Sequence, residues 1–264
     1  MRTVTSKDGT TIAFDQWGGG PVVILVDGAL QYRAFDQGMV DLANLLSQHF
    51  TVIHYDRRGR GDSTDTQPYA LEREIEDIEA IIDEAGGSAS LYGISSGAAL
   101  AMEAAIKLRN KVTKLAMYEA PYNDDAASRQ AWKEYTKQLG EILAAGRDGD
   151  AVGLFMMLVG ATADQVEEIR QTPMWPLWEA VAPTLAYDHI AALGEEAAVP
   201  TDRAARVTVP ALVMDGSESF PFMHATAQAL ASAMPNGEHR TLEGQTHEVA
   251  AEALAPVLVE FFKA

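Results

Sequence analysis

Short apolar runs alternate along this chain with longer segments in which apolar residues recur at helical spacing. The apolar runs are rich in β-branched residues, which is typical of strands buried on both faces. We expect such strands at residues 22–26, 51–55, 89–92, 114–118 and 211–214, and helices at residues 39–47, 72–84, 96–108, 223–233 and 249–262. This alternation predicts an α/β fold with a mostly parallel central sheet flanked by helices on both faces.

Weaker patterns predict three further strands. Residues 10–16 alternate in polarity after a turn at residues 7–9, which indicates a β-hairpin with residues 2–5. A short strand at residues 239–242 is expected near the edge of the sheet. With the hairpin counted, the strand at residues 114–118 is the sixth of the chain.

Residues 121–207 show no strand pattern and are rich in Ala, Met, Trp and Glu. Because the sheet pattern resumes directly afterwards, we predict a helical lid here, inserted after the sixth strand into a core of residues 1–120 and 208–264. The alternative is an ordinary bundle of surface helices. We expect apolar side chains of the lid and of the loop after residues 211–214 to line a substrate pocket, although they could instead fill the lid's own core: Met156, Trp175, Trp178 and Phe220.

A candidate nucleophile lies between the strand at residues 89–92 and the helix that follows. Residues 93–97 read GISSG, and a sharp strand-to-helix turn exposes the central side chain, Ser95. A Cβ at either flanking glycine would collide with neighbouring backbone, and the N–H groups of the helix favour negative charge beside Ser95. The alternative is a plain glycine turn without catalytic function.

A serine hydroxyl needs a base, and this base is usually a histidine. In folds with this type of turn the chain order is serine, acid, histidine, which places the base after the last strand. His247 lies in the loop between residues 239–242 and the final helix, so we predict that it is the base. The remaining histidines lie where this order does not favour them: His49, His54, His189, His224 and His239.

Three carboxylates are candidates for the acid. The usual acid position, after the strand at residues 211–214, is occupied by Ser219, with Asp215 and Glu218 nearby. Glu119 instead ends the sixth strand, at the sheet edge where catalytic loops gather. A carboxylate there is costly unless it is hydrogen-bonded, and the His247 N–H is a suitable partner. We favour Glu119, with a structural salt bridge as the alternative role.

Two backbone N–H groups are needed for the oxyanion of the intermediate. One is expected from Ser96, and the second from Gly28 or Ala29 in the loop after residues 22–26. The neighbouring Asp27 should point away, because a negative charge would oppose the oxyanion. Residues 56–63 look like an anion-binding loop, but no helix start of phosphate-loop form follows, so a structural turn is predicted.

Charge and composition narrow the partners. The 264 residues contain 20 Lys plus Arg against 38 Asp plus Glu, a net charge of −18, which opposes nucleic-acid binding. There is no Cys, so disulfides, thiolate chemistry and Cys-ligated zinc are excluded. Residues 1–9 do not read as a signal peptide, and the apolar runs are far shorter than the about 20 residues that span a membrane. We expect a cytoplasmic protein.

These motifs together resemble the α/β-hydrolase family over essentially the whole chain: the strand and turn at residues 22–28, the turn at residues 56–63, the serine turn at residues 93–97 and the loop at residues 244–247. The family includes esterases, lactonases, lyases and ligand receptors. Serine at position 95 argues against the dehalogenase and epoxide-hydrolase branches, which use aspartate there.

A closer likeness is to zearalenone-type lactone hydrolases, which carry an Asp-Gly oxyanion turn, a Ser-Ser-Gly-Ala segment and a glutamate acid after the next strand. Residues 27–28, 95–98 and Glu119 are similar to these features. The resemblance implies a serine hydrolase of a small apolar ester or lactone that uses Ser95, His247 and Glu119, with no metal or organic cofactor. The alternative is a non-hydrolytic lyase or receptor on the same fold.

Overall fold

The computed structural model describes residues 1–264, apart from the side chain of residue 191. Its centre is an eight-stranded sheet with the order β1-β2-β4-β3-β5-β6-β7-β8. The first two strands pair antiparallel, and β3 to β8 are parallel to one another. The strands are β1 (Arg2–Thr5), β2 (Thr11–Gly18), β3 (Val22–Val26), β4 (Thr51–Tyr55), β5 (Ala89–Ile94), β6 (Val112–Tyr118), β7 (Ala211–Gly216) and β8 (Gly237–Leu242).

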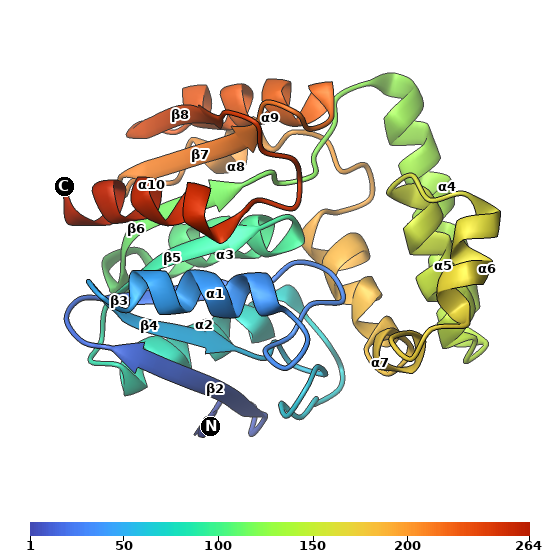
Figure 1. The fold of residues 1–264 in the computed structure, drawn as a ribbon, viewed down its shortest axis with the longest axis horizontal. Helices are drawn as coiled ribbons and strands as arrows, with labels where there is room; N and C mark the ends of the chain where they lie inside the picture. The colour runs from blue at the N-terminus through green and yellow to red at the C-terminus, as the bar shows by residue number, and fades with distance from the viewer.

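Helices cover both faces of the sheet (Figure 1). α1 (Gln37–Leu46) and α10 (Ala251–Lys263) lie side by side on one face, and α2 (Leu71–Glu84), α3 (Ser96–Leu108) and α9 (Pro221–Ala233) cover the other. Successive strand residues point to opposite faces, so Ile24 packs in the core under α3 while Leu25 packs under α1 and α10. Burial on both faces explains why β3 is a continuous apolar run. The predicted α/β-hydrolase fold is confirmed.

Most of the segment between β6 and β7 stands beyond one end of the sheet (Figure 1), and its last short helix returns to pack against α9. Its elements are α4 (Ala126–Ala144), α5 (Asp148–Leu158), α6 (Ala163–Arg170), α7 (Trp175–Glu179), the 3-10 turn η2 (Ala182–Thr184), the π-helix η3 (Ala186–Ala192) and α8 (Thr201–Ala204). We call this segment the lid. A further 3-10 turn, η1 (Arg109–Lys111), links α3 to β6. In the part of the chain that the structure describes, no helix is long and apolar enough to cross a membrane.

Candidate active site

Ser95 occupies a strained turn between β5 and α3. Its backbone has φ 57° and ψ −128°, in a region that residues other than glycine rarely adopt. A Cβ placed on Gly97 would lie 2.3 Å from the carbonyl oxygen of Val26, and one on Gly93 would lie 2.4 Å from the carbonyl oxygen of Gly97. The turn therefore closes only with glycine at both flanking positions, and it holds Ser95 at the N-terminus of α3.

The loop after β3 approaches Ser95 closely at Gly28. A Cβ on Gly28 would lie 3.1 Å from the Ser95 Cβ, so glycine is needed for this approach. The Gly28 N–H already donates a hydrogen bond to Gln31 Oε1 at 2.7 Å. Of the two N–H groups that the sequence offered here, the one on Ala29 is therefore the better oxyanion donor. The second predicted donor, Ser96, is the buried first residue of α3.

Glu119 and His247 meet across the end of the sheet. Glu119 follows β6 with a φ of 47°, and its side chain is buried. Its Oε2 lies 2.7 Å from His247 Nδ1. The carboxylate also accepts hydrogen bonds from the Gly216 N–H to Oε1 and from the Ser219 hydroxyl to Oε2, both at 2.8 Å. With its proton on Nδ1, His247 donates to Glu119 and keeps Nε2 as a proton acceptor.

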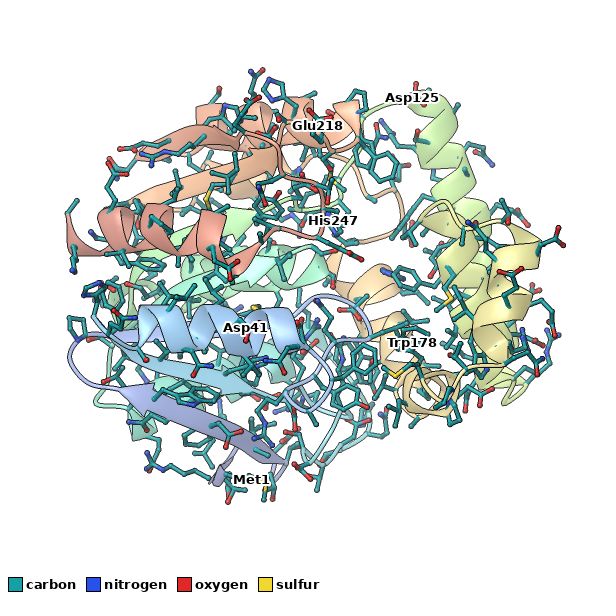
Figure 2. The ribbon with its side chains drawn as sticks, in the orientation of Figure 1. Met1, Asp41, Asp125, Trp178, Glu218 and His247 are labelled. Carbon is teal, nitrogen blue, oxygen red and sulfur yellow. The ribbon has the colours of Figure 1, made fainter. Side chains whose placement is uncertain are left out.

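Contacts with neighbouring strands fix the loop that carries His247. The Tyr118 hydroxyl donates to the carbonyl of Thr246 at 2.5 Å, and the Glu218 N–H donates to the carbonyl of Gln245 at 2.9 Å. Figure 2 shows His247 at the end of the sheet that faces the lid. Its side chain is 37% exposed, so a partner can reach it while Glu119 behind it stays dry.

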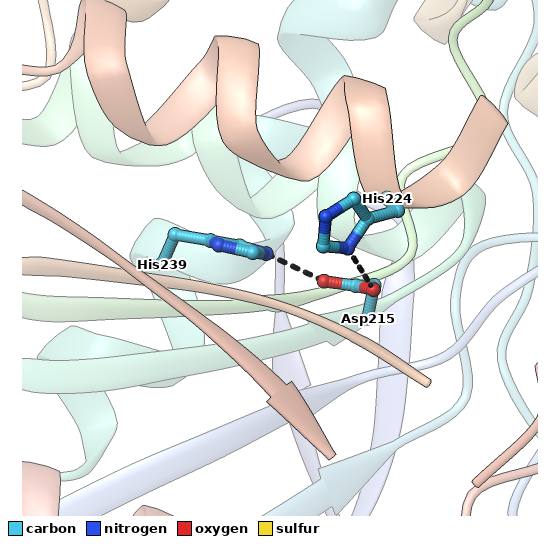
Figure 3. A group of neighbouring side chains, drawn as sticks. All are labelled: Asp215, His224 and His239. Atoms are coloured by element: carbon cyan, nitrogen blue, oxygen red, sulfur yellow. Dashed lines mark hydrogen bonds and ion pairs between the residues drawn. The ribbon is translucent and has the colours of Figure 1, made fainter. Parts of the chain in front are cut away.

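The two rival acids lie elsewhere. Glu218 is exposed, and its backbone contacts the His247 loop only through the N–H described above. Asp215 is buried and accepts from His239 Nε2 at 2.6 Å and from His224 Nδ1 at 2.9 Å (Figure 3). The usual acid position thus holds Ser219, whose hydroxyl supports Glu119.

Asp215, His224 and His239 form a group whose ligand atoms all lie within 4.8 Å of one another. Two imidazoles and a carboxylate suit a zinc-type ion. Such an ion, at about 2.0–2.1 Å from each ligand in tetrahedral geometry, would separate the ligand atoms by roughly 3.3 Å. The direct hydrogen bonds are shorter than this, so we interpret the group as a cross-link between β7, β8 and α9.

Asp27, at the end of β3, is paired with a histidine of the neighbouring strand. Its carboxylate lies 2.8 Å from His54 Nε2 on the neighbouring β4, and both side chains are fully buried. Burial acts to lower the pKa of His54, but the carboxylate of Asp27, with smaller effects from Asp36 and Asp56, outweighs it and raises that pKa. His54 therefore neutralises Asp27 and has a structural role.

The turn after β4 is structural, as predicted, but in an unexpected form, because its arginines are all buried. Arg57 binds both carboxylate oxygens of Glu74 on α2 at 2.7 Å, and Arg58 binds those of Asp77 at 2.7 and 2.8 Å. Arg60 binds Asp188 of the lid at 2.5 Å. Buried charges of this kind require partners on several sides, and α2 and η3 supply them.

The four predicted pocket residues differ in their surroundings. Trp178 is partly buried, and its ring lies 5.5 Å from that of Phe35 in the loop after β3. Met156 is also partly buried. Trp175 is buried inside the lid beneath the guanidinium of Arg170, while Phe220 is 51% exposed just before α9. Only Trp178 is thus seen to join the lid to the loops around Ser95.

Comparisons with known proteins agree with this fold. The model of the alpha/beta hydrolase family matches residues 19–258. The crystal structure of an alpha/beta hydrolase from Sphaerobacter thermophilus is 52% identical, with a TM-score of 0.86, and the match covers 99% of this chain and 100% of that one. A thermophilic esterase from Thermogutta terrifontis is 22% identical (TM-score 0.73; 99% and 97% covered). The enol-lactonase from Burkholderia xenovorans is 19% identical (TM-score 0.71; 100% of both chains).

A match among curated proteins is shorter. The protein named "Probable oxidoreductase EphD" from Mycobacterium tuberculosis is 35% identical over 88 residues, which make up 31% of this chain. The match covers 14% of that protein's length, so this chain corresponds to a small part of it.

Proposed function

This chain belongs to the alpha/beta hydrolase family, and we propose that it cleaves a carboxylic ester or lactone through Ser95, His247 and Glu119. The observation that carries the proposal is the 2.7 Å contact between His247 and the buried Glu119, at the same sheet end as the strained Ser95 turn. The esterase and the enol-lactonase among the similar structures support this class of substrate.

The residues would divide the reaction as follows. Ser95 Oγ attacks the carbonyl carbon while His247 Nε2 takes its proton, and Glu119 stabilises the resulting imidazolium. The carbonyl oxygen becomes an oxyanion that accepts from the Ser96 and Ala29 N–H groups. When the intermediate collapses, the alcohol leaves with the proton from His247. A water molecule, activated by the same imidazole, then releases the acid and restores Ser95.

The lid supports an apolar substrate. Trp178, which Figure 2 labels, and Met156 are partly buried on the lid. The Trp178 ring packs against Phe35, in the loop that also carries Ala29. An apolar acyl or alcohol group would gain free energy by covering these side chains. We therefore propose that the substrate is a small apolar ester or lactone bound between the lid and Ser95.

Fluorophosphonate labelling followed by intact-mass measurement tests the mechanism. Wild type should take up one label, Ser95→Ala none, and Glu119→Gln should react at least 100-fold more slowly. Glu218→Gln, a change of the same kind at an exposed carboxylate, is the matched control and should react as wild type does.

Other outcomes would refute the proposal in different ways. Labelling of folded Ser95→Ala would remove the serine from the mechanism. If Glu218→Gln is labelled slowly and Glu119→Gln at the wild-type rate, the acid is Glu218 in the loop after β7. A folded wild type that neither labels nor releases acid from ester and lactone substrates would exclude hydrolysis and favour a lyase or a ligand receptor.

A further inference from the structure

The two carbonyl groups on either side of Gly28 are held by buried arginines. Arg60 Nη1 donates to the Gly28 carbonyl at 2.5 Å and to the Gln31 carbonyl at 3.2 Å. Arg57 Nη1 donates to the Asp27 carbonyl at 3.2 Å. Both guanidinium groups therefore contact the backbone of the oxyanion loop, from the side that the turn after β4 occupies.

Peptide geometry converts these contacts into a direction for the Ala29 N–H. A trans peptide is planar, so its C=O and N–H point in opposite directions. The Gly28 carbonyl and the Ala29 N–H belong to one peptide group, and Arg60 fixes the orientation of that group through the carbonyl. A guanidinium that donates a hydrogen bond to the carbonyl oxygen also polarises the peptide group and makes its N–H a stronger donor. Arg60 thus acts on the Ala29 N–H through the carbonyl at the opposite side of the same peptide group.

Asp188 of the lid connects this arginine with the second donor. The carboxylate is fully buried and accepts from Arg57 and from Arg60, each at 2.5 Å. It also accepts from the hydroxyl of Ser96 at 2.8 Å. Ser96 carries the other N–H expected to bind the oxyanion. One carboxylate from η3 therefore contacts both Arg60, which binds the peptide that carries the Ala29 N–H, and the side chain of Ser96.

We propose that Asp188 and Arg60 are positioning residues that aim the Ala29 and Ser96 N–H groups at the oxyanion, so that the oxyanion hole depends on a side chain supplied by the lid. This inference rests on the proposed function. Because Asp188 comes from η3, the two donors are held in place only when this π-helix is seated on the turn after β4. The lid then contributes to transition-state stabilisation as well as to the pocket.

The same turn contains a matched control. Arg58 is as deeply buried as Arg60, and it pairs with the buried Asp77 as Arg60 pairs with Asp188. The hydrogen bonds of Arg58 go to Asp77, to Asp8 and to the carbonyl of Arg73. Removing the charge of Asp77 therefore tests what a lost buried ion pair does when the oxyanion loop is untouched.

The experiment compares Asp188→Asn, Arg60→Lys and Ser96→Ala with the controls Asp77→Asn and Arg58→Lys. Steady-state kinetics on a p-nitrophenyl ester should show a 10- to 100-fold lower kcat for Asp188→Asn and Arg60→Lys, with KM within about twofold of wild type. Ser96→Ala, which keeps its N–H and buries no unpaired charge, should lose about three- to tenfold. The controls should show a lower Tm and a kcat within about twofold of wild type.

A trifluoromethyl ketone gives a readout that loss of stability alone would not change. Ser95 Oγ adds to its carbonyl carbon, the carbonyl oxygen takes the electron pair as an oxyanion, and the serine proton moves to His247. Its inhibition constant should rise in proportion to the loss of kcat/KM in the three variants and stay constant in the controls.

Each result decides the inference. Equal kcat and equal ketone affinity in Asp188→Asn and Asp77→Asn, measured where both are folded, would overturn it. If Asp188→Asn does not fold, Arg60→Lys and Ser96→Ala decide by the same criteria. A wild type without labelling and without ester hydrolysis would overturn the proposed function and this inference together. Labelling of wild type with unaffected variants would overturn the inference alone.

Discussion

The fold should lose stability as the pH falls from neutral to 5, because His189 takes up a proton in the unfolded chain but stays neutral in the folded protein. This side chain is buried on η3 among aromatic rings, and its Nδ1 lies 2.8 Å from the Tyr135 hydroxyl. Burial, with a smaller effect from Arg60 and Arg57, lowers its pKa to about 4, although Asp188 acts in the opposite direction. The imidazole is therefore neutral in the folded protein at pH 5, whereas in the unfolded chain it is charged.

The magnitude follows from the two pKa values. The ordinary pKa of histidine is 6.5, and that of His189 in the folded protein is about 4. Between these two pH values the unfolded chain binds one more proton than the folded protein, so stability falls as the pH is lowered. At pH 5 the loss is about 2 kcal/mol, from 1.36 kcal/mol for each pH unit below 6.5. The loss is complete near pH 4. His54 acts in the opposite direction, because its pKa is raised and its contribution declines above pH 6.5.

Urea unfolding at pH 7.5 and at pH 5.0 measures this effect. His189→Asn keeps an oxygen acceptor near the position of Nδ1 for Tyr135 and removes the titrating group. Wild type should lose about 2 kcal/mol more between the two pH values than His189→Asn does, because contributions of carboxylates are common to both. His49→Asn, at an exposed histidine, serves as the control and should behave as wild type does. Equal losses in wild type and His189→Asn would refute the reasoning.

Three further predictions concern packing and hydrogen bonds. Gly97→Ala should lower the free energy of unfolding by at least about 3 kcal/mol or prevent folding, because its Cβ would lie 2.3 Å from a backbone oxygen. Gly140→Ala, in open space on α4, should raise that free energy by about 0.5–1 kcal/mol. Urea unfolding measures both changes. Ser219→Ala removes one of the hydrogen bonds to the buried candidate acid, so it should lower kcat roughly tenfold in ester hydrolysis and also lower Tm. His239→Ala should lower stability by about 1–3 kcal/mol, seen as a lower Tm, because it leaves buried Asp215 with one imidazole partner fewer.

Local patterns were enough to predict the fold and the sharp glycine-flanked turn at Ser95. Apolar runs without polar alternation predict parallel strands, and the structure has them. The strained turn at Ser95 depends on two glycines within two residues of it, so its signal is contained in five letters. His247 was singled out by chain order alone, and its contact with Glu119 is compatible with that assignment.

Long-range contacts between charged groups could not be predicted from the sequence. Arg60 and Asp188 are 128 positions apart, and charged residues are ordinarily solvated, so neither position suggests burial. The one usable signal was a turn with three arginines next to a helix with acidic residues at its buried positions Glu74 and Asp77. The choice between Gly28 and Ala29 likewise depended on the hydrogen bond that the Gly28 N–H donates to Gln31 Oε1, which no periodicity predicts.

The support that Ser219 gives Glu119 has an evolutionary consequence. The hydroxyl at the usual acid position and the imidazole of His247 bind the same carboxylate oxygen, at 2.8 and 2.7 Å. Side chains from the loop after β7 and from the end of β6 therefore converge on the same place beside His247. A carboxylate supplied from either position would therefore lie close to the same imidazole. The strand that carries the acid can differ between proteins of this fold while the histidine loop keeps one position.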